Sequence, residues 1–180
     1  MLVGSFGYSQ QKVRYGLRGG LNVTKLLSID QPAALGYHVG GFAKIPVGSF
    51  VSLQPEVTFS TKGMRTSTLG LEDANYRFRY LDVPLLLSVN VGSVVDVQFG
   101  GYASYLLHVD TSSGMTNLDK RDFTTLDFGI VAGLGIDVGN LQIGARYNFG
   151  LVQAAETNRA IAQLGHAKWG NAQLYVAVIF

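Results

Sequence analysis

Hydrophobic and polar residues alternate with a period of two along much of this chain. Between residues 126 and 138 the even positions are apolar, whereas the odd positions hold mostly glycine and aspartate. Between residues 141 and 151 the odd positions are apolar instead, and the even positions are Gln, Gly, Arg, Asn and Gly. Successive side chains of a β-strand point to opposite faces, so each stretch has one apolar face and one small or polar face. Segments of about ten such residues, separated by turns, are typical of transmembrane β-barrels.

Eight segments of this kind can be placed along the chain, at residues 14–23, 34–45, 49–62, 75–89, 93–107, 123–138, 140–151 and 170–180. They predict an all-β fold, an eight-stranded antiparallel up-and-down transmembrane β-barrel that forms a single domain over residues 11–180. Residues 1–10 combine a short apolar stretch with small residues at Gly7 and Ser9, without a basic start. We interpret them as a truncated signal remnant or a flexible leader.

The connections between these segments alternate between short and long. Residues 46–49, 90–93 and 139–140 are short and contain turn-forming residues. The connections near 24–33, 63–74, 108–122 and 152–169 are longer and polar. Bacterial outer membrane barrels have short periplasmic turns and long extracellular loops. The pattern therefore predicts an integral protein of the bacterial outer membrane, with four extracellular loops and both termini on the periplasmic side.

Alternation alone does not say which face points inward, because a soluble lipocalin-like barrel would bury its apolar face. The interior of an eight-stranded barrel is just wide enough for side chains to fill. The apolar positions of all eight segments together are too bulky for that space. A soluble barrel would also carry many Lys and Glu residues outside, whereas the opposite face here is rich in glycine. We therefore expect outer membrane lipid to contact the apolar face.

Composition agrees with a membrane barrel and excludes several other classes. Hydrophobic residues make up 47% of the 180 residues and charged residues 14%, against roughly 25% charged in a typical soluble domain. No uninterrupted apolar run reaches the roughly 18 residues that a membrane helix needs. The absence of cysteine excludes disulfides and thiolate metal sites. A formal charge of +2 gives no reason to expect nucleic acid as a partner.

Six segments distributed between residues 35 and 180 carry a family resemblance: residues 35–63, 76–90, 99–107, 126–139, 141–151 and 174–180. In these segments the chain resembles the PorT-like outer membrane β-barrel family of Gram-negative bacteria. The most specific parts of the resemblance are the Tyr-Leu-Asp-Val-Pro segment at residues 80–84 and the terminal Phe180. The resemblance implies an eight-stranded barrel inserted by the outer membrane assembly machinery, which would recognise the last strand. The family has few assigned activities; its namesake is linked to a protein secretion system.

Charged residues recur on the predicted inward face of the strands. Whether a residue number is odd or even, which we call its parity, assigns it to one face of its strand. The charged residues with inward parity are Arg18, Lys44, Glu56, Asp82, Asp96, Asp127, Asp137 and Arg146. Unpaired charges are costly in a narrow lumen, so we expect these residues to pair. The resemblance adds that the family usually has an acidic residue at the position of Asp82. We interpret the set as a structural cluster that fills the barrel; the alternative is a narrow channel or proton path. A wide porin channel is disfavoured.

The histidines provide little support for an enzyme. Some outer membrane barrels are lipid A hydrolases or acyltransferases, which need a nucleophile, a base and an orienting acid. Ser104, His108 and Asp110 are close in sequence, with Ser104 and His108 both inward by parity, but no nucleophile motif is present. His38 is expected in the lumen, and His108 and His166 are expected near long extracellular loops. We predict no enzyme activity, no metal and no cofactor, with a lipid A-modifying enzyme as the alternative.

Three further features affect the predicted barrel. Gly133-Leu134-Gly135 lies within a strand, so small lumenal packing explains it better than a nucleotide-binding loop. Pro55 and Pro84 each remove a backbone donor inside a closed sheet, which predicts a bulge or locally broken pairing at each.

The predicted loops carry charges of both signs and could bind a protein partner, a glycan or lipopolysaccharide. These loop residues are Arg65, Glu72, Asp73, Asp119, Lys120, Arg121, Asp122, Glu156, Arg159 and Trp169.

Overall fold

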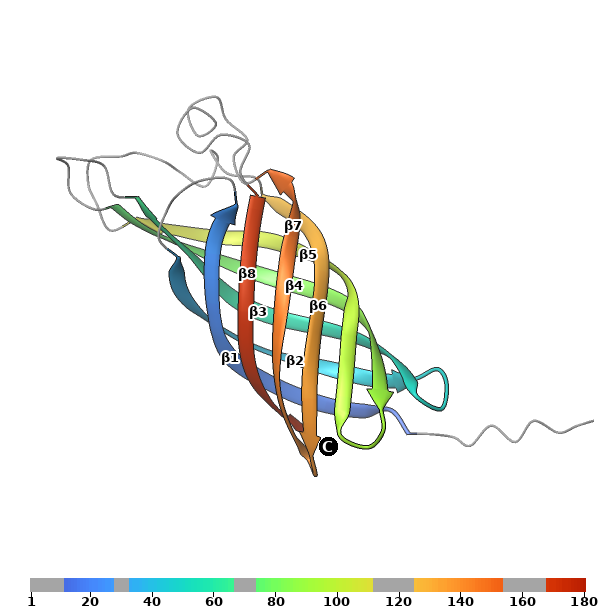
Figure 1. Ribbon diagram of the computed structural model, residues 1–180. Coiled ribbons are helices and arrows are strands. Elements are labelled where there is room, and N and C mark those ends of the chain that lie inside the picture. Colours follow the sequence, from blue (N-terminus) through green and yellow to red (C-terminus); the bar gives the residue numbers. More distant parts are fainter. Residues whose placement is uncertain (1–11, 28–32, 67–73, 112–124, 154–167) are drawn as a thin grey trace, which may run out of the picture.

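The chain folds into a closed antiparallel β-barrel (Figure 1). The computed structural model describes residues 12–27, 33–66, 74–111, 125–153 and 168–180. The strands are β1 (Arg14–Leu27), β2 (Ala34–Pro46), β3 (Val51–Thr66), β4 (Ala74–Val91), β5 (Val95–Thr111), β6 (Leu126–Val138), β7 (Leu141–Gln153) and β8 (Lys168–Ile179). Each strand pairs with its neighbours in the chain, and β1 pairs with β8 to close the wall. The predicted eight-stranded up-and-down barrel is confirmed.

No helix among the described residues is long and apolar enough to cross a membrane.

The alternation places bulky apolar side chains outside the barrel, as predicted. Leu21, Leu134 and Leu174 are 61%, 57% and 66% exposed. The strand residues next to them point inward, and Asn22 and Gln173 are buried. The apolar faces of neighbouring strands therefore form one continuous outer surface around the wall.

Three strands end four residues later than the sequence pattern predicts. β1 reaches Leu27, β3 reaches Thr66 and β5 reaches Thr111, whereas the predicted segments ended at residues 23, 62 and 107. The extra residues pair in the ladder although apolar alternation has stopped, as Lys25 does with Gly170. Backbone hydrogen bonds do not require apolar side chains, so the pattern underestimated strand length. The central parts of the four predicted loops lie outside the described residues, as do residues 1–11.

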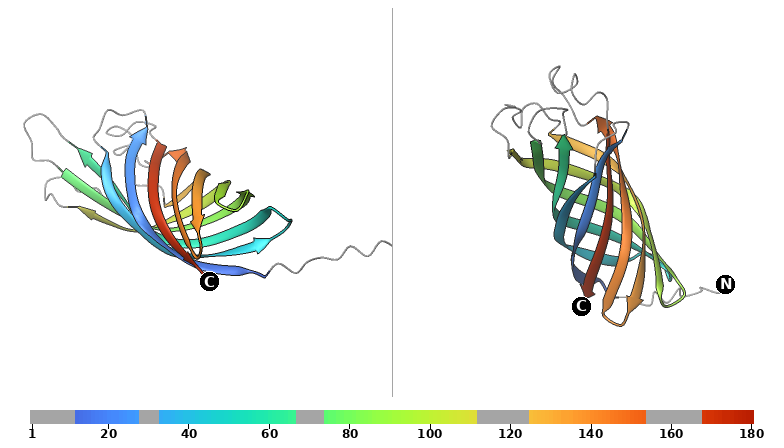
Figure 2. Two further views of the ribbon diagram at one scale, coloured as in Figure 1. Left: turned by 60° about the horizontal axis from the view of Figure 1, so that its bottom comes forward. Right: turned by 60° about the vertical axis from the view of Figure 1, so that its left-hand side comes forward.

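The three short connections lie at one end of the barrel, which we call the turn end. They are residues 47–50, 92–94 and 139–140. Gly92 and Gly139 have positive φ angles of 68° and 62°, a conformation that glycine adopts without steric cost. The beginning of β1 and the end of β8 lie at the same end (Figures 1 and 2).

The two strand prolines interrupt the ladder, as predicted. The β2–β3 pairing lacks two successive ladder pairs at Pro55, and the β3–β4 pairing lacks two at Pro84. The register is the same on both sides of each gap. The prolines therefore break the pairing locally and do not create bulges.

A bulge lies elsewhere, between β4 and β5. Arg79 is opposite His108 and Tyr80 is opposite Leu106, so Leu107 is an extra residue on β5. A bulge inserts one residue and exchanges the faces of the residues that follow. Leu106 is buried in the ordinary alternation of β5, whereas Leu107 and His108 are both exposed because the alternation changes at the bulge. The prediction that His108 points inward is therefore wrong.

Candidate functional site

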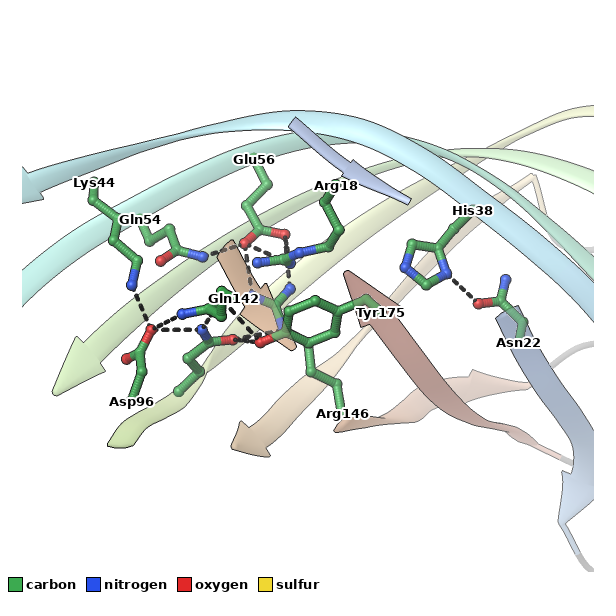
Figure 3. A network of polar contacts seen from close by, with 11 residues as sticks. Arg18, Asn22, His38, Lys44, Gln54, Glu56, Asp96, Gln142, Arg146 and Tyr175 are labelled. Atoms are coloured by element: carbon green, nitrogen blue, oxygen red, sulfur yellow. Dashed lines mark hydrogen bonds and ion pairs between the residues drawn. The ribbon is translucent and has the colours of Figure 1, made fainter. Parts of the chain in front are cut away.

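The middle of the lumen is crossed by an ion-pair cluster of Arg18, Glu56 and Arg146, from β1, β3 and β7 (Figure 3). Glu56 accepts hydrogen bonds from Nη1 of Arg18 at 2.9 and 3.0 Å. It also accepts bonds from Nη1 and Nη2 of Arg146, both at 2.8 Å. Nε2 of Gln54 donates a further bond to the same carboxylate. All three charged residues are at least 95% buried, so one carboxylate connects three strands across the barrel.

A second ion pair lies closer to the turn end. Lys44 of β2 binds Asp96 of β5, and both side chains are fully buried. Asp96 also accepts hydrogen bonds from Ser88, Gln98 and Gln142. A buried carboxylate is stable only when such donors replace its water.

Gln98 joins the two clusters. Its Oε1 accepts a hydrogen bond of 2.7 Å from Nε of Arg146, and its Nε2 donates to Asp96 at 2.8 Å. A continuous chain of hydrogen bonds therefore runs from Lys44 to Arg18 across five strands. We call it the central network, and it comprises Arg18, Lys44, Glu56, Asp96, Gln98 and Arg146.

Two further carboxylates lie beyond the central network, away from the turn end. Asp127 of β6 binds Nζ of Lys62 at 3.3 Å and accepts a hydrogen bond of 3.1 Å from Tyr102. Asp82 of β4 accepts hydrogen bonds from the hydroxyls of Ser60 and Ser104 on its two neighbouring strands. Asp82 is therefore held by neutral donors, whereas Asp127 has a cationic partner.

The charges buried in the described part of the lumen balance. The cations are Arg18, Lys44, Lys62 and Arg146, and the carboxylates are Glu56, Asp82, Asp96 and Asp127, four of each sign. The cavity beside the cluster of Arg18, Glu56 and Arg146 has a volume of about 10 Å³, which is about the space that one water molecule needs. The fully buried charges therefore cancel, and the space beside this cluster is about that of a single water molecule.

Aromatic rings are buried in the lumen, and some of them lie against a glycine of the neighbouring strand. Tyr175 lies over Gly144, and Tyr102 lies over Gly129. The Tyr175 ring also has the Arg18 guanidinium 4.2 Å from its centroid, and its hydroxyl donates to Gln142. Parity identified the small residues, but it did not identify the rings that occupy the space beside them.

The structure places every residue of the predicted lumenal cluster inside the barrel. Arg18, Lys44, Glu56, Asp82, Asp96, Asp127 and Arg146 are all buried. Asp137 is only half-buried and accepts a hydrogen bond from Gln142. Lys62 was missed because it is the last residue of a predicted strand, next to a predicted loop. Lys62 has an even residue number, as does Glu56 on the same strand, and this shared parity could have placed it on the inward face.

The residues considered for catalysis do not converge in the structure. The Ser104 hydroxyl donates to Asp82 inside the lumen, whereas His108 is exposed on the other side of the bulge. The Asp110 side chain and His166 lie outside the described residues. His38 is buried, and its Nδ1 lies 2.7 Å from Oδ1 of Asn22. Within the described ranges, no group of three or more His, Asp or Glu residues is arranged to hold a metal ion.

Comparison with known families gives one match that covers most of the chain. Residues 8–156 match the family model described as outer membrane protein beta-barrel domain. In a search by sequence, no curated protein matches the chain.

Solved structures share the fold at low sequence identity. The crystal structure of Ail of Yersinia pestis, in complex with the heparin analogue sucrose octasulfate, has a TM-score of 0.56 at 14% identity, over 94% of this chain and 99% of Ail. Neisserial surface protein A has a TM-score of 0.56 at 13% identity, over 92% and 96% of the two chains. OprG of Pseudomonas aeruginosa has a TM-score of 0.50 at 13% identity, over 93% and 95%.

Proposed function

Because the chain belongs to the outer membrane protein beta-barrel domain family, we propose that it is a structural or partner-binding component of the bacterial outer membrane whose lumen is closed by side chains. The proposal assigns it to the PorT-like group, on the sequence segments that carry this resemblance. It also places the turn end and both termini in the periplasm, and the four long connections outside the cell.

The observation that carries this proposal is the contact of Glu56 with both Arg18 and Arg146. The three residues come from β1, β3 and β7 and meet in the middle of the lumen. They occupy the cross-section that a channel would need, and Glu56 binds both arginines. A barrel closed in this way has its outer surface and its loops available for binding.

The proposed partners follow from these surfaces. Outer membrane lipid contacts the apolar outer face, and the outer membrane assembly machinery recognises the chain during insertion. A protein or glycan partner would bind the extracellular loops. Ail has been crystallised with a polyanionic heparin analogue, so a polyanion is one reasonable class of ligand to test. Nucleic acid is not among the proposed partners.

Planar-bilayer recording tests whether the lumen is closed. The wild-type protein is expected to produce no stepwise conductance. A triple variant with Arg18, Glu56 and Arg146 all changed to alanine is expected to produce steps, since removal of these side chains opens the middle of the lumen. Stepwise conductance of the wild-type protein would contradict the closed lumen and support the narrow-channel alternative.

The stabilising role of the cluster can be measured with Glu56→Ala. This variant leaves two buried guanidinium groups without their carboxylate, and the loss of one partner of a buried ion pair costs about 3–5 kcal/mol. The free energy of unfolding in urea, measured in detergent micelles, should fall by that amount. The control is Asp137→Ala, which removes a half-buried carboxylate bound by Gln142 and should cost about 1 kcal/mol. Equal losses in the two variants would argue against a special role for Glu56.

A further inference from the structure

An open cavity of about 730 Å³ lies at the turn end of the barrel. Its wall combines the beginning of β1 with the β2–β3 turn, the β4–β5 turn and Phe180. Small-molecule sites have volumes of roughly 300–1,000 Å³, so this cavity has the size of a ligand site. It is separate from the central network, whose members do not line it.

The charged side chains that line this cavity are basic. Lys12 and Arg14 contribute to the wall, and no Asp or Glu side chain does so among the described residues. Lys44, the ladder partner of Arg14, is already bound to Asp96. Within the described part of the chain, Lys12 and Arg14 have no ion pair. Two positively charged side chains therefore line an open cavity to which no Asp or Glu side chain of the described residues contributes.

Part of the rim of the same cavity is apolar and adjoins the outer face of the barrel. Val13, Phe50 and Phe180 line the cavity and are 42%, 67% and 69% exposed. The backbone N–H of Phe180 donates to the carbonyl of Tyr15, whose side chain belongs to the apolar outer face. An amphiphile could keep its acyl chains on this face while its polar head bends over the rim.

We propose that this cavity binds the phosphate-bearing headgroup of an anionic glycerophospholipid. The phosphate would lie between Lys12 and Arg14, because basic side chains near a membrane surface attract anionic lipids. Ser49 and Asn90, which also line the cavity, provide neutral polar groups for the glycerol part of the head. The acyl chains would follow Val13 and Phe180 onto the outer face. The site does not depend on whether the lumen is closed.

The test measures binding of a fluorescent phosphatidylglycerol to the full chain in nanodiscs of phosphatidylcholine. Wild-type protein should bind it more tightly than a phosphatidylcholine with the same label. The double variant Lys12→Gln, Arg14→Gln should bind it about thirty-fold more weakly, since each basic residue contributes on the order of a five-fold factor near an anionic surface. The charge-preserving variant Lys12→Arg, Arg14→Lys should retain binding, which separates loss of charge from misfolding.

A matched control is Lys25→Gln, which removes an exposed basic residue at the opposite end of β1. It should leave the affinity unchanged. An equal loss in this control would mean that overall charge attracts the lipid, and would overturn the site. Displacement by millimolar inorganic phosphate would identify a site for free phosphate instead of a lipid. Tighter lipid binding after removal of residues 1–11 would make that segment the natural occupant and would also overturn the proposal.

Discussion

At the scale of single residues, the inward glycines allow aromatic rings to lie inside the barrel. A Cβ atom built on Gly144 would lie 2.5 Å from the Tyr175 ring, and one built on Gly129 would lie 2.4 Å from the Tyr102 ring. Outward glycines are different, since a Cβ on Gly101 would have no neighbour closer than 3.6 Å. The same residue type therefore has a packing role on one face and none on the other.

Alanine substitutions at two glycines should have opposite effects on stability. Gly144→Ala would place its methyl group 2.5 Å from both the Tyr175 ring and the carbonyl oxygen of Leu134, and such overpacking typically costs about 1–3 kcal/mol. Gly101→Ala adds a methyl group on the open outer face and should stabilise the strand by about 0.5–1 kcal/mol, because glycine loses more backbone entropy on folding. Urea unfolding in micelles, followed by the fluorescence of the single tryptophan, measures both. The packing argument fails if both variants shift the unfolding midpoint in the same direction.

At the scale of elements, the wall is not paired uniformly. The β2–β3 and β3–β4 ladders have gaps at Pro55 and Pro84. The β7–β8 ladder, in contrast, is continuous from Leu141↔Val178 to Phe149↔Gly170. Both gaps border β3, the strand that carries Glu56. The central network therefore connects β3 to the wall in the region where its backbone ladders are weakest.

Amide hydrogen exchange should reveal these gaps. Neighbouring amides of a strand point to opposite sides, so one of the amides of Ala43 and Lys44 points to the gap at Pro55. We expect that amide to exchange on the order of ten-fold or more faster than amides in the middle of β7, since a missing hydrogen bond lowers the cost of local opening. NMR on the deuterated protein in micelles gives the rates. Uniform protection across β2 and β7 would show that water or side chains complete the ladder.

At the scale of the whole molecule, the barrel is polar inside and apolar outside, the reverse of a soluble protein. Balanced buried charges and aromatic rings occupy the described lumen, while residues such as Val83 of β4 are exposed on the outer surface. Hydrocarbon around the wall makes this arrangement stable, because water there would leave a large apolar surface exposed.

Arginine substitutions on the outer face should depend on depth in the bilayer. Val83 lies in the middle of β4, whereas Val47 lies in the β2–β3 turn, and the two are 48% and 61% exposed. Val83→Arg should reduce the stability of the folded barrel in lipid vesicles by about 2–4 kcal/mol, whereas Val47→Arg should cost about 0–1 kcal/mol. Urea titrations in vesicles measure both values. Similar costs at the two positions would contradict the proposed immersion of the wall.

The sequence by itself determined the number of strands, the face that points outward and most of the charged residues that enter the lumen. These follow from a period of two, which is a local property of each strand, and from the limited volume of an eight-stranded barrel. Only the tertiary structure decided which lumenal residues meet. The contact of Arg18 and Arg146 with Glu56 depends on the register of β1, β3 and β7, and the outward position of His108 depends on one inserted residue. The cavity at Lys12 and Arg14 likewise needs turns and strand ends that are far apart in the chain, because closure of the barrel brings them together.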